Sequence, residues 1–115
     1  MNFGRSNHSS CCLGDNIYVF CGIGESNEPI NSIEMLENAA SEVLLGRLWV
    51  KINFSMRDFP PRWIPAVTAL DNTIAVSGGF TTDEVGEDGV MGDVILFDPI
   101  NNNVDLKVKN IPGLI

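Results

Sequence analysis

Short alternations of apolar and polar residues follow one another along the chain, and residues typical of turns separate them. Trp49 to Ile52 alternates in this way, whereas Val94 to Phe97 is apolar throughout. The first pattern is typical of a strand buried on one face, and the second of a strand covered on both. Such patterns predict eight strands, at Ser9–Leu13, Ile17–Gly22, Ser32–Leu36, Trp49–Ile52, Ala66–Leu70, Thr73–Gly79, Asp93–Asp98 and Val104–Val108.

The segments between these strands favour turns and irregular connections. Tight turns, rich in residues that tolerate positive φ, are predicted at residues 14–16, 71–72 and 101–103. Residues 37–48 have a helix-forming composition, but Gly46 interrupts them and the run is short, so we expect an extended turn with some helical character. Three prolines in the connector 53–65 exclude a helix or an interior strand there.

Two stretches of the chain repeat one another. Residues 13–22 and 70–79 match at a constant offset of 57, which pairs Leu13 with Leu70, Ile17 with Ile74, Val19 with Val76 and Gly22 with Gly79. A repeat of this length is typical of stacked or circular arrays, because one unit cannot bury both of its apolar faces. We therefore expect two four-stranded antiparallel units, at residues 1–56 and 57–115.

Composition narrows the classes of partner. The chain has 115 residues, of which 44% are hydrophobic, so it has enough apolar side chains for a core. Its formal net charge of −8 argues against nucleic acid and anionic membrane surfaces, which attract clustered Lys and Arg. No apolar run reaches the roughly 18 residues of a membrane helix, and the polar start lacks the apolar segment of a signal peptide.

The cysteines favour an intracellular, cytoplasmic protein. Cys11, Cys12 and Cys21 are odd in number, and Cys11 and Cys12 should point to opposite faces of a strand. A zinc site would need Cys-x-x-Cys or histidine partners, and His8 is the only histidine. We expect reduced, buried thiols and no metal.

No catalytic constellation is visible, so we expect no enzyme activity and no cofactor. His8 lacks a positioned serine and carboxylate, and the glycine pairs lack the spacing of a phosphate loop. The segment 81–93 holds five carboxylates, but their spacing does not match an EF-hand. We expect it to be a solvated loop that could meet a basic partner.

The motifs resemble the kelch repeat of β-propellers over about residues 5–110. The first copy offers Arg5-x-x-His8-Ser9, Ile17 to Phe20 with Gly22, Asn31 to Glu34, and Trp49; the second offers Pro61-Arg62, Ile74 to Gly79, Gly92 to Val94, and Phe97-Asp98-Pro99. Departures are Cys21 in place of a first glycine, Leu36-Glu37 in place of aromatic-Asp, and the lack of a tryptophan after Phe97. These motif residues are expected to pack blades together rather than to act in catalysis.

This resemblance implies an all-β fold, a partial β-propeller of two four-stranded antiparallel kelch-type blades. A propeller closes with about four to eight blades. Two blades alone would therefore leave their apolar outer faces exposed to solvent. The sequence thus predicts either self-association or missing further blades, and the apolar end at 111–115 favours something missing downstream.

The resemblance also implies a partner site on one propeller face, where the loops 23–31, 53–65 and 80–92 should gather. The predicted partner-binding residues are Arg5, Asn7, Arg57, Arg62, Trp63, Asp83 and Glu84, chosen because arginine and tryptophan are frequent interface anchors and acids suit a basic partner. The alternative for Arg62 and Trp63 is that they pack the junction between blades.

Three functional hypotheses follow. The first is a kelch-type protein–protein interaction module belonging to a larger propeller, scaffold or adaptor. The second is part of a kelch-type oxidase or sugar-converting enzyme, which a single histidine and a single tyrosine, Tyr18, argue against. The third is a structural remnant without independent activity.

Overall fold

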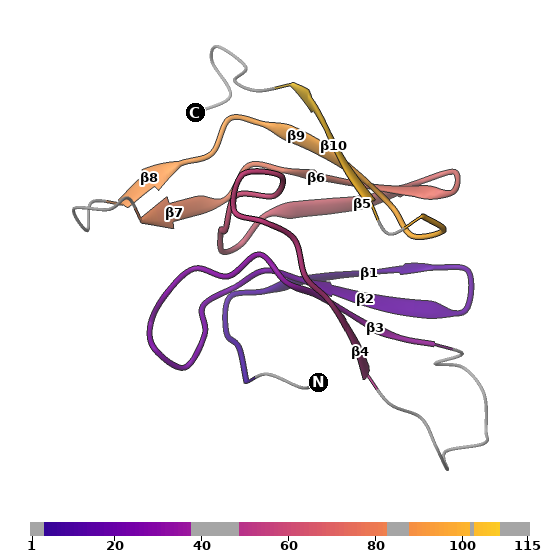
Figure 1. Ribbon diagram of the computed structural model, residues 1–115, viewed down its shortest axis with the longest axis horizontal. Helices are drawn as coiled ribbons and strands as arrows, with labels where there is room; N and C mark the ends of the chain where they lie inside the picture. Colours follow the sequence, from indigo (N-terminus) through magenta and orange to yellow (C-terminus); the bar gives the residue numbers. More distant parts are fainter. Residues whose placement is uncertain (1–3, 38–48, 83–87, 102, 109–115) are drawn as a thin grey trace.

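The computed structural model describes residues 4–37, 49–82, 88–101 and 103–108, and every regular element in these ranges is a β-strand (Figure 1). The first sheet is an antiparallel meander of β1 (Ser9–Leu13), β2 (Asn16–Phe20), β3 (Ile33–Leu36) and β4 (Trp49–Ile52), in that order. Its strands are joined first by the predicted tight turn and then by longer connections. The expectation of an all-β, antiparallel fold is confirmed.

The second sheet has the order β10-β9-β6-β5 and lies on the first (Figure 1). Its strands are β5 (Ala66–Leu70), β6 (Thr73–Ser77), β9 (Val94–Asp98) and β10 (Asn103–Val108). All eight predicted strands are present; three have the predicted bounds, and the bounds of the other five differ by one or two residues. The predicted extended turn at 37–48 lies, apart from Glu37, outside the described residues.

One hairpin differs from the prediction of a solvated loop. Strands β7 (Phe80–Thr82) and β8 (Asp88–Val90) pair antiparallel and project beyond the second sheet (Figure 1). Phe80 and the two threonines that follow have high β-propensity. The abundance of acids in this segment hid that signal.

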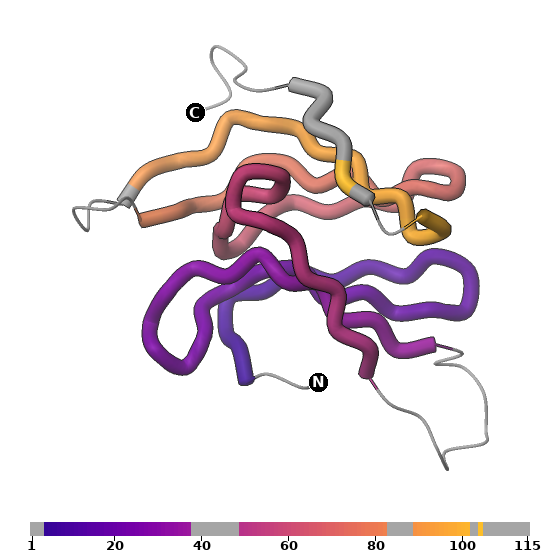
Figure 2. Tube along the Cα trace, in the orientation of Figure 1, coloured from indigo at the N-terminus to yellow at the C-terminus, as the bar shows by residue number. Residues whose placement is uncertain are grey.

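The core lies between the two sheets. Alternate residues of each strand point inward, and Phe97 of the second sheet contacts Tyr18 and Phe20 of the first edge to face, with ring centroids 5.9 Å apart in both pairs. The connector runs from one sheet to the other (Figure 2) and adds Phe54 and Phe59 to this core. The connector is thus part of the packing between the sheets.

The backbone repeats as the sequence does. Positive φ recurs at the offset of 57 in the pairs Asn7 and Ile64, Gly14 and Asp71, Cys21 and Gly78, and Gly22 and Gly79. A Cβ on Gly22 would lie 2.6 Å from the carbonyl oxygen of Ser6, and one on Gly79 would lie 2.8 Å from that of Trp63. Only glycine combines this left-handed backbone with so close an approach.

Candidate functional site

Three connecting segments meet at one end of the stacked sheets. Single bridges join Ser6 to Ile23, Ile30 to Arg62 and Trp63 to Phe80, so the segments 23–31 and 53–65 and the described part of 80–92 lie against one another. We call the exposed surface of these segments the loop face. The structure therefore brings together the three loops in which the sequence placed a partner site.

Arg62 lies beneath this surface and has no solvent-exposed area. Its two terminal nitrogens donate to the two carboxylate oxygens of Asp93, with Nη2 to Oδ2 at 2.6 Å. Nη1 also donates to the carbonyl of Gly78 at 3.1 Å, and Nε to that of Pro60 at 3.2 Å. A bidentate, fully hydrogen-bonded pair of this kind offsets the cost of burying both charges.

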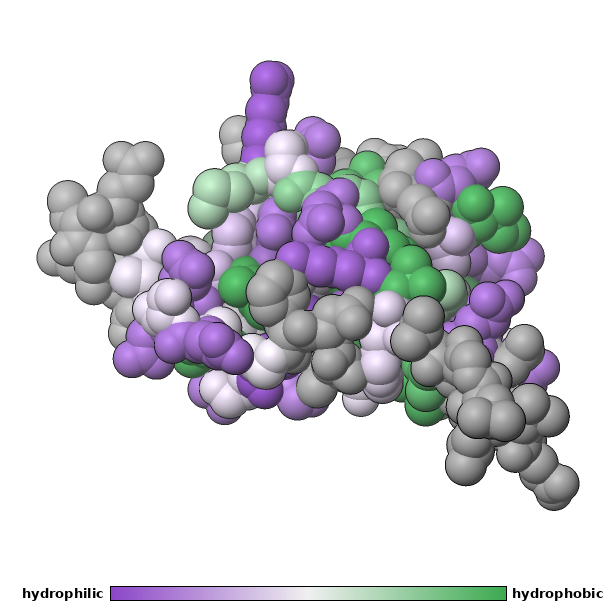
Figure 3. Space-filling view, turned by 60° about the horizontal axis from the view of Figure 1, so that its bottom comes forward, coloured by the Kyte–Doolittle hydropathy of each residue, from purple (hydrophilic) through white to green (hydrophobic). Residues whose placement is uncertain are grey.

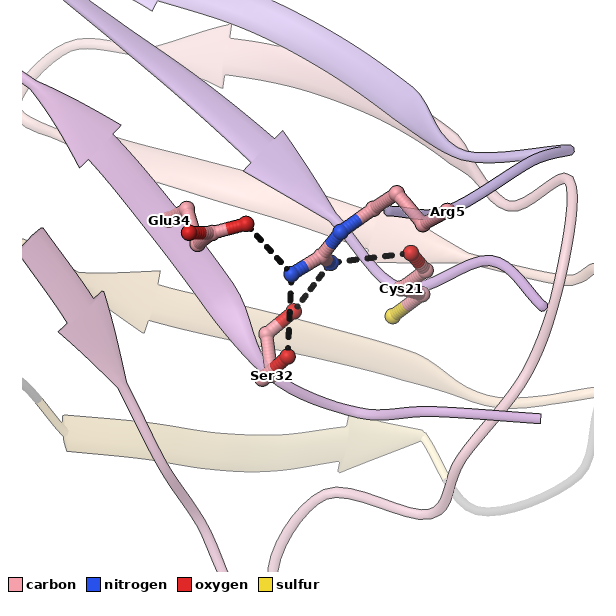
Figure 4. A network of polar contacts seen from close by, with 4 residues as sticks. All are labelled: Arg5, Cys21, Ser32 and Glu34. Atoms are coloured by element: carbon pink, nitrogen blue, oxygen red, sulfur yellow. Dashed lines mark hydrogen bonds and ion pairs between the residues drawn. The ribbon is translucent and has the colours of Figure 1, made fainter. Parts of the chain in front are cut away.

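Arg5 occupies the equivalent place in the first unit, at the offset of 57 (Figure 4). Its Nη2 donates to Glu34 Oε2 at 2.8 Å and to Ser32 Oγ at 3.1 Å, and its Nη1 donates to the carbonyls of Cys21 and Ser32 at 3.0 Å each. The side chains of Arg5 and Glu34 are both fully buried. Each unit thus begins with an arginine held under its loops.

The two arginine sites differ in where the carboxylate stands. Ile30 and Met91 donate to the carbonyls of the equivalent glycines, Gly22 and Gly79, which sets the offset in the third strand at 91 − 30 = 61. At this offset Asp93 matches Ser32, and Ile95 matches Glu34. The acid therefore lies two residues further along the strand in the first unit, on the same strand face.

The Nε of Arg5 is buried and has no hydrogen-bond partner in the described part of the chain. The matching atom of Arg62 donates to Pro60, whose equivalent is position 3, outside the described residues. Otherwise the guanidinium groups of Arg5 and Arg62 have extensive partners inside the protein. Neither guanidinium is exposed enough to contact a partner, which corrects the place of both arginines among the predicted partner-binding residues. For Arg62 the burial fits the alternative of junction packing.

The other predicted site residues differ in their exposure to solvent. Asn7 and Arg57 are exposed, and Trp63 is half-buried. Asn7 lies against the loop face, because its carbonyl accepts a hydrogen bond from Ile64 at 2.7 Å. Asp83 and Glu84 lie outside the described residues.

Trp63 and Phe80 form an aromatic pair on the loop face. Their rings stack with centroids 6.0 Å apart and an interplanar angle of 28°. Two reciprocal main-chain hydrogen bonds of 2.9 Å hold their backbones together. Phe80 is 41% exposed, and the neighbouring Ile64 is 52% exposed.

The sequence reading missed Phe80 and Ile64. The signal that could have found them is their place in the repeat, since Trp63 and Phe80 match Ser6 and Ile23 of the first unit at the offset of 57. Ser6 and Ile23 make the same pair of main-chain hydrogen bonds, at 3.0 and 2.8 Å. The aromatic pair is therefore an addition to a shared backbone, not a requirement of it.

A hollow of about 400 Å³ lies beside the loop face, between the segment 24–32 and the connector. Asn31 fixes the two walls together, because its Nδ2 donates to the carbonyls of Phe54, Ser55 and Phe59. The lining includes Glu25, Glu28 and Lys51. Apolar side chains, among them Ile30 and Met56, complete the lining.

The cysteines are spread over different environments. Cys11 is half-buried, Cys12 is exposed and Cys21 is buried, so the prediction that all three are buried is wrong for Cys12. Cys12 faces away from the core because neighbours on a strand point to opposite sides. Burial raises the pKa of Cys21 to about 12, and burial followed by the nearby Cys12 raises the pKa of Cys11.

Within the described ranges, no three His, Cys, Asp or Glu side chains gather as metal ligands would. His8, the single imidazole, is exposed rather than packed as expected. Nor do these ranges contain a helix long and apolar enough to span a membrane.

No protein-family model and no curated protein matches the chain. Among solved structures it is similar to the structure of YjhT, with a TM-score of 0.69 over 94% of this chain and 20% sequence identity. The chain spans 28% of the length of that structure's chain. At this identity the likeness concerns the fold alone.

Proposed function

We propose that the chain is a pair of kelch-type blades belonging to a β-propeller, and that it acts as a protein–protein interaction module. The repeated backbone supports the first part, since each unit has an arginine under its loops and a glycine that touches the preceding segment. The likeness of its fold to part of a longer chain is compatible with it. On this proposal the loop face binds the partner.

The observation that carries the binding proposal is the Trp63–Phe80 pair. It is an aromatic addition to a position where the first unit has Ser6 and Ile23, and reciprocal hydrogen bonds hold it in place. Large aromatic side chains on a rigid backbone are the usual anchors of protein interfaces. The exposed rings therefore serve a contact outside the unit.

Ile64 adds to this argument. It has a φ of 50°, which a β-branched residue rarely adopts, and its side chain is half exposed between Trp63 and buried Pro65. Strained backbone of this kind gathers at binding sites. The partner is expected to carry an apolar anchor for this group and basic side chains for the surrounding acids, since the net charge is −8.

The test compares two variants that each remove one exposed apolar side chain. Phe80→Ala removes the outer ring of the pair, while Ile100→Ala removes a side chain that is 79% exposed in the turn between β9 and β10, at the other end of the second sheet (Figure 1). Quantitative affinity purification with wild type and both variants would identify partners, and calorimetry would measure Kd with each purified candidate.

We expect Phe80→Ala to weaken the specific partner at least about tenfold, the loss of roughly 1.4 kcal/mol typical of an interface anchor. Ile100→Ala should leave Kd unchanged. Equal binding by wild type and Phe80→Ala would contradict the assignment of the loop face. Both variants should unfold at the same temperature as wild type, because neither ring nor aliphatic group is buried.

A further inference from the structure

Each sheet covers the other with one face, and its opposite face points away from the other sheet. On this outer face of the first sheet Val19 and Glu34 are already buried, Glu34 beside Arg5. The strand register places two rows of side chains on the outer face of the first sheet: Ser10, Val19, Glu34 and Lys51 in one, and Cys12, Ile17, Leu36 and Trp49 in the other. The second row is apolar across all four strands. Figure 3 brings this side of the molecule forward and shows apolar side chains gathered among polar ones.

The outer face of the second sheet follows from the same register. Its members are Ala66, Thr68, Leu70, Thr73, Ala75, Ser77, Val94 and Leu96. Leu96 and Val94 are half-buried, and Leu70 is 50% exposed. These residues stand outside the core cluster between the sheets.

The repeat makes these two outer faces equivalent to the two faces that already meet. Ile17 and Val19 on the outer face of the first sheet match Ile74 and Val76, which the first sheet covers. Tyr18 and Phe20, which the second sheet covers, match Ala75 and Ser77 on the outer face of the second sheet. Each outer face is thus the counterpart of a buried one.

Compared with the matching covered faces, the outer face of the second sheet has smaller side chains and that of the first sheet has a larger one. Where the covered face of the first sheet has Tyr18 and Phe20, the outer face of the second has the small Ala75 and Ser77. Trp49 pairs with Leu36 on the outer face of the first sheet. The matching pair on the covered face of the second sheet is Val104 and Phe97, so Trp49 replaces the smaller Val104. If the two outer faces were packed together, the large Trp49 of one would be compensated by the small Ala75 and Ser77 of the other, as close packing requires.

Main-chain groups that bond across the internal junction have counterparts at the two ends, and no partner for these lies among the described residues. The N–H of Gly22 donates to the carbonyl of Arg62 at 2.9 Å across the junction. Among the described residues, neither the N–H of Gly79 nor the carbonyl of Arg5, the matching groups, has a hydrogen-bond partner. The N–H of Gly79 in one copy of the chain could thus donate to the carbonyl of Arg5 in another copy.

From these matches we infer that the chain self-associates head to tail, with the outer face of the second sheet of one copy docked on the outer face of the first sheet of the next. The contact is heterologous, so repeating it gives a closed ring if the rotation closes. With two sheets per copy, rings of about four to eight sheets take two to four copies. The inference uses the sheet faces and does not depend on the loop face.

Two variants damage one outer face each. Leu36→Lys places a charge in the apolar row of the first sheet, and Leu96→Lys places one at the centre of the outer face of the second. Ser26→Lys, on an exposed loop, is the matched control for the added charge. Sedimentation equilibrium would give the mass of each protein over a range of concentrations.

Wild type and Ser26→Lys should form a discrete species of two to four copies, as the closed ring predicts. Each outer-face variant alone should associate at least about tenfold more weakly, because every contact would bury an unpaired charge. Mixing the two variants should give a one-to-one dimer, since each supplies the intact face that the other lacks. Variants that merely disturbed the fold would not restore association when mixed.

Circular dichroism and cooperative unfolding would confirm that the variants fold. If either fails, Cys12→Lys and Leu70→Lys replace them, because both side chains are exposed on the same outer faces. A wild-type monomer at high concentration would overturn the inference. So would an association that only one of the two variants weakens, which would indicate a contact between identical faces.

Discussion

Arg62 holds both carboxylate oxygens of Asp93, a residue 31 positions later in the chain. The pair joins the start of the second unit to the residue that precedes β9, and both side chains are almost completely buried. Phe59 packs under the guanidinium, whose Cζ lies 5.5 Å from the ring centroid. The ion pair therefore adds a buried link between the connector and the second sheet.

Asp93→Asn should destabilise the protein by about 3–5 kcal/mol, because it leaves the buried charge of Arg62 without a counter-charge. Urea unfolding followed by tryptophan fluorescence would measure the loss. Asp58→Asn makes the same chemical change at an exposed site and should cost no more than about 0.5 kcal/mol. Equal effects of the two changes would show that the ion pair contributes little.

The displaced carboxylate of the first unit gives a second prediction. Glu34→Ile restores the residue found at the matching position of the second unit, but it leaves Arg5 unpaired and should cost about 3–5 kcal/mol. Adding Ser32→Asp rebuilds the arrangement of Arg62 and Asp93. The double variant should recover part of the loss.

A double-mutant cycle by urea unfolding would measure this recovery as a coupling free energy of about 1–3 kcal/mol. Ser32→Asp alone is the control, and it should destabilise because a second buried carboxylate would share one arginine. Additive effects of the two changes would mean that the two arginine sites are not interchangeable.

Local patterns predicted the strands well because burial on one face leaves a period of two in the sequence. Trp49–Ile52 and Ala66–Leu70 have the predicted bounds. The hairpin β7–β8 was missed because its short strands lie in an acidic segment. A strand of three residues leaves almost no periodicity to detect.

The burial of Arg5 and Arg62 could not be predicted in the same way. Their acids lie 29 and 31 residues away and come close only when the strands pair in the observed register. The acids also break the repeat, since Glu34 and Asp93 occupy different positions of the third strand in each sheet. Without the position of these acids, the sequence indicated only two arginines outside the strands, and these were predicted to be exposed interface anchors.

Gly22→Ala and Gly79→Ala should each destabilise the protein by about 2–4 kcal/mol, since the new methyl group would both meet a carbonyl oxygen and require a left-handed backbone. Gly89→Ala is the control, because a Cβ there meets no atom within 4 Å. Thermal unfolding would compare the three. A cost for Gly89→Ala as large as the others would argue against the close approach as the cause.

Cys21 gives a prediction for high pH. Its thiol has a pKa of about 12 in the folded protein against 9.0 ordinarily, with burial as the largest cause. Between these values the unfolded chain loses the proton and the folded one keeps it, so ionisation favours unfolding. The contribution of Cys21 to stability is complete below pH 9 and declines as the pH rises towards 12.

The measurement is the difference in unfolding free energy between wild type and Cys21→Ala at a series of pH values. Wild type should lose stability relative to the variant above pH 9, because alanine has no proton to lose, and titration of other groups cancels in the difference. A pH-independent difference for Cys21→Ala would contradict the burial of this thiol, as would its rapid labelling by iodoacetamide in the folded protein.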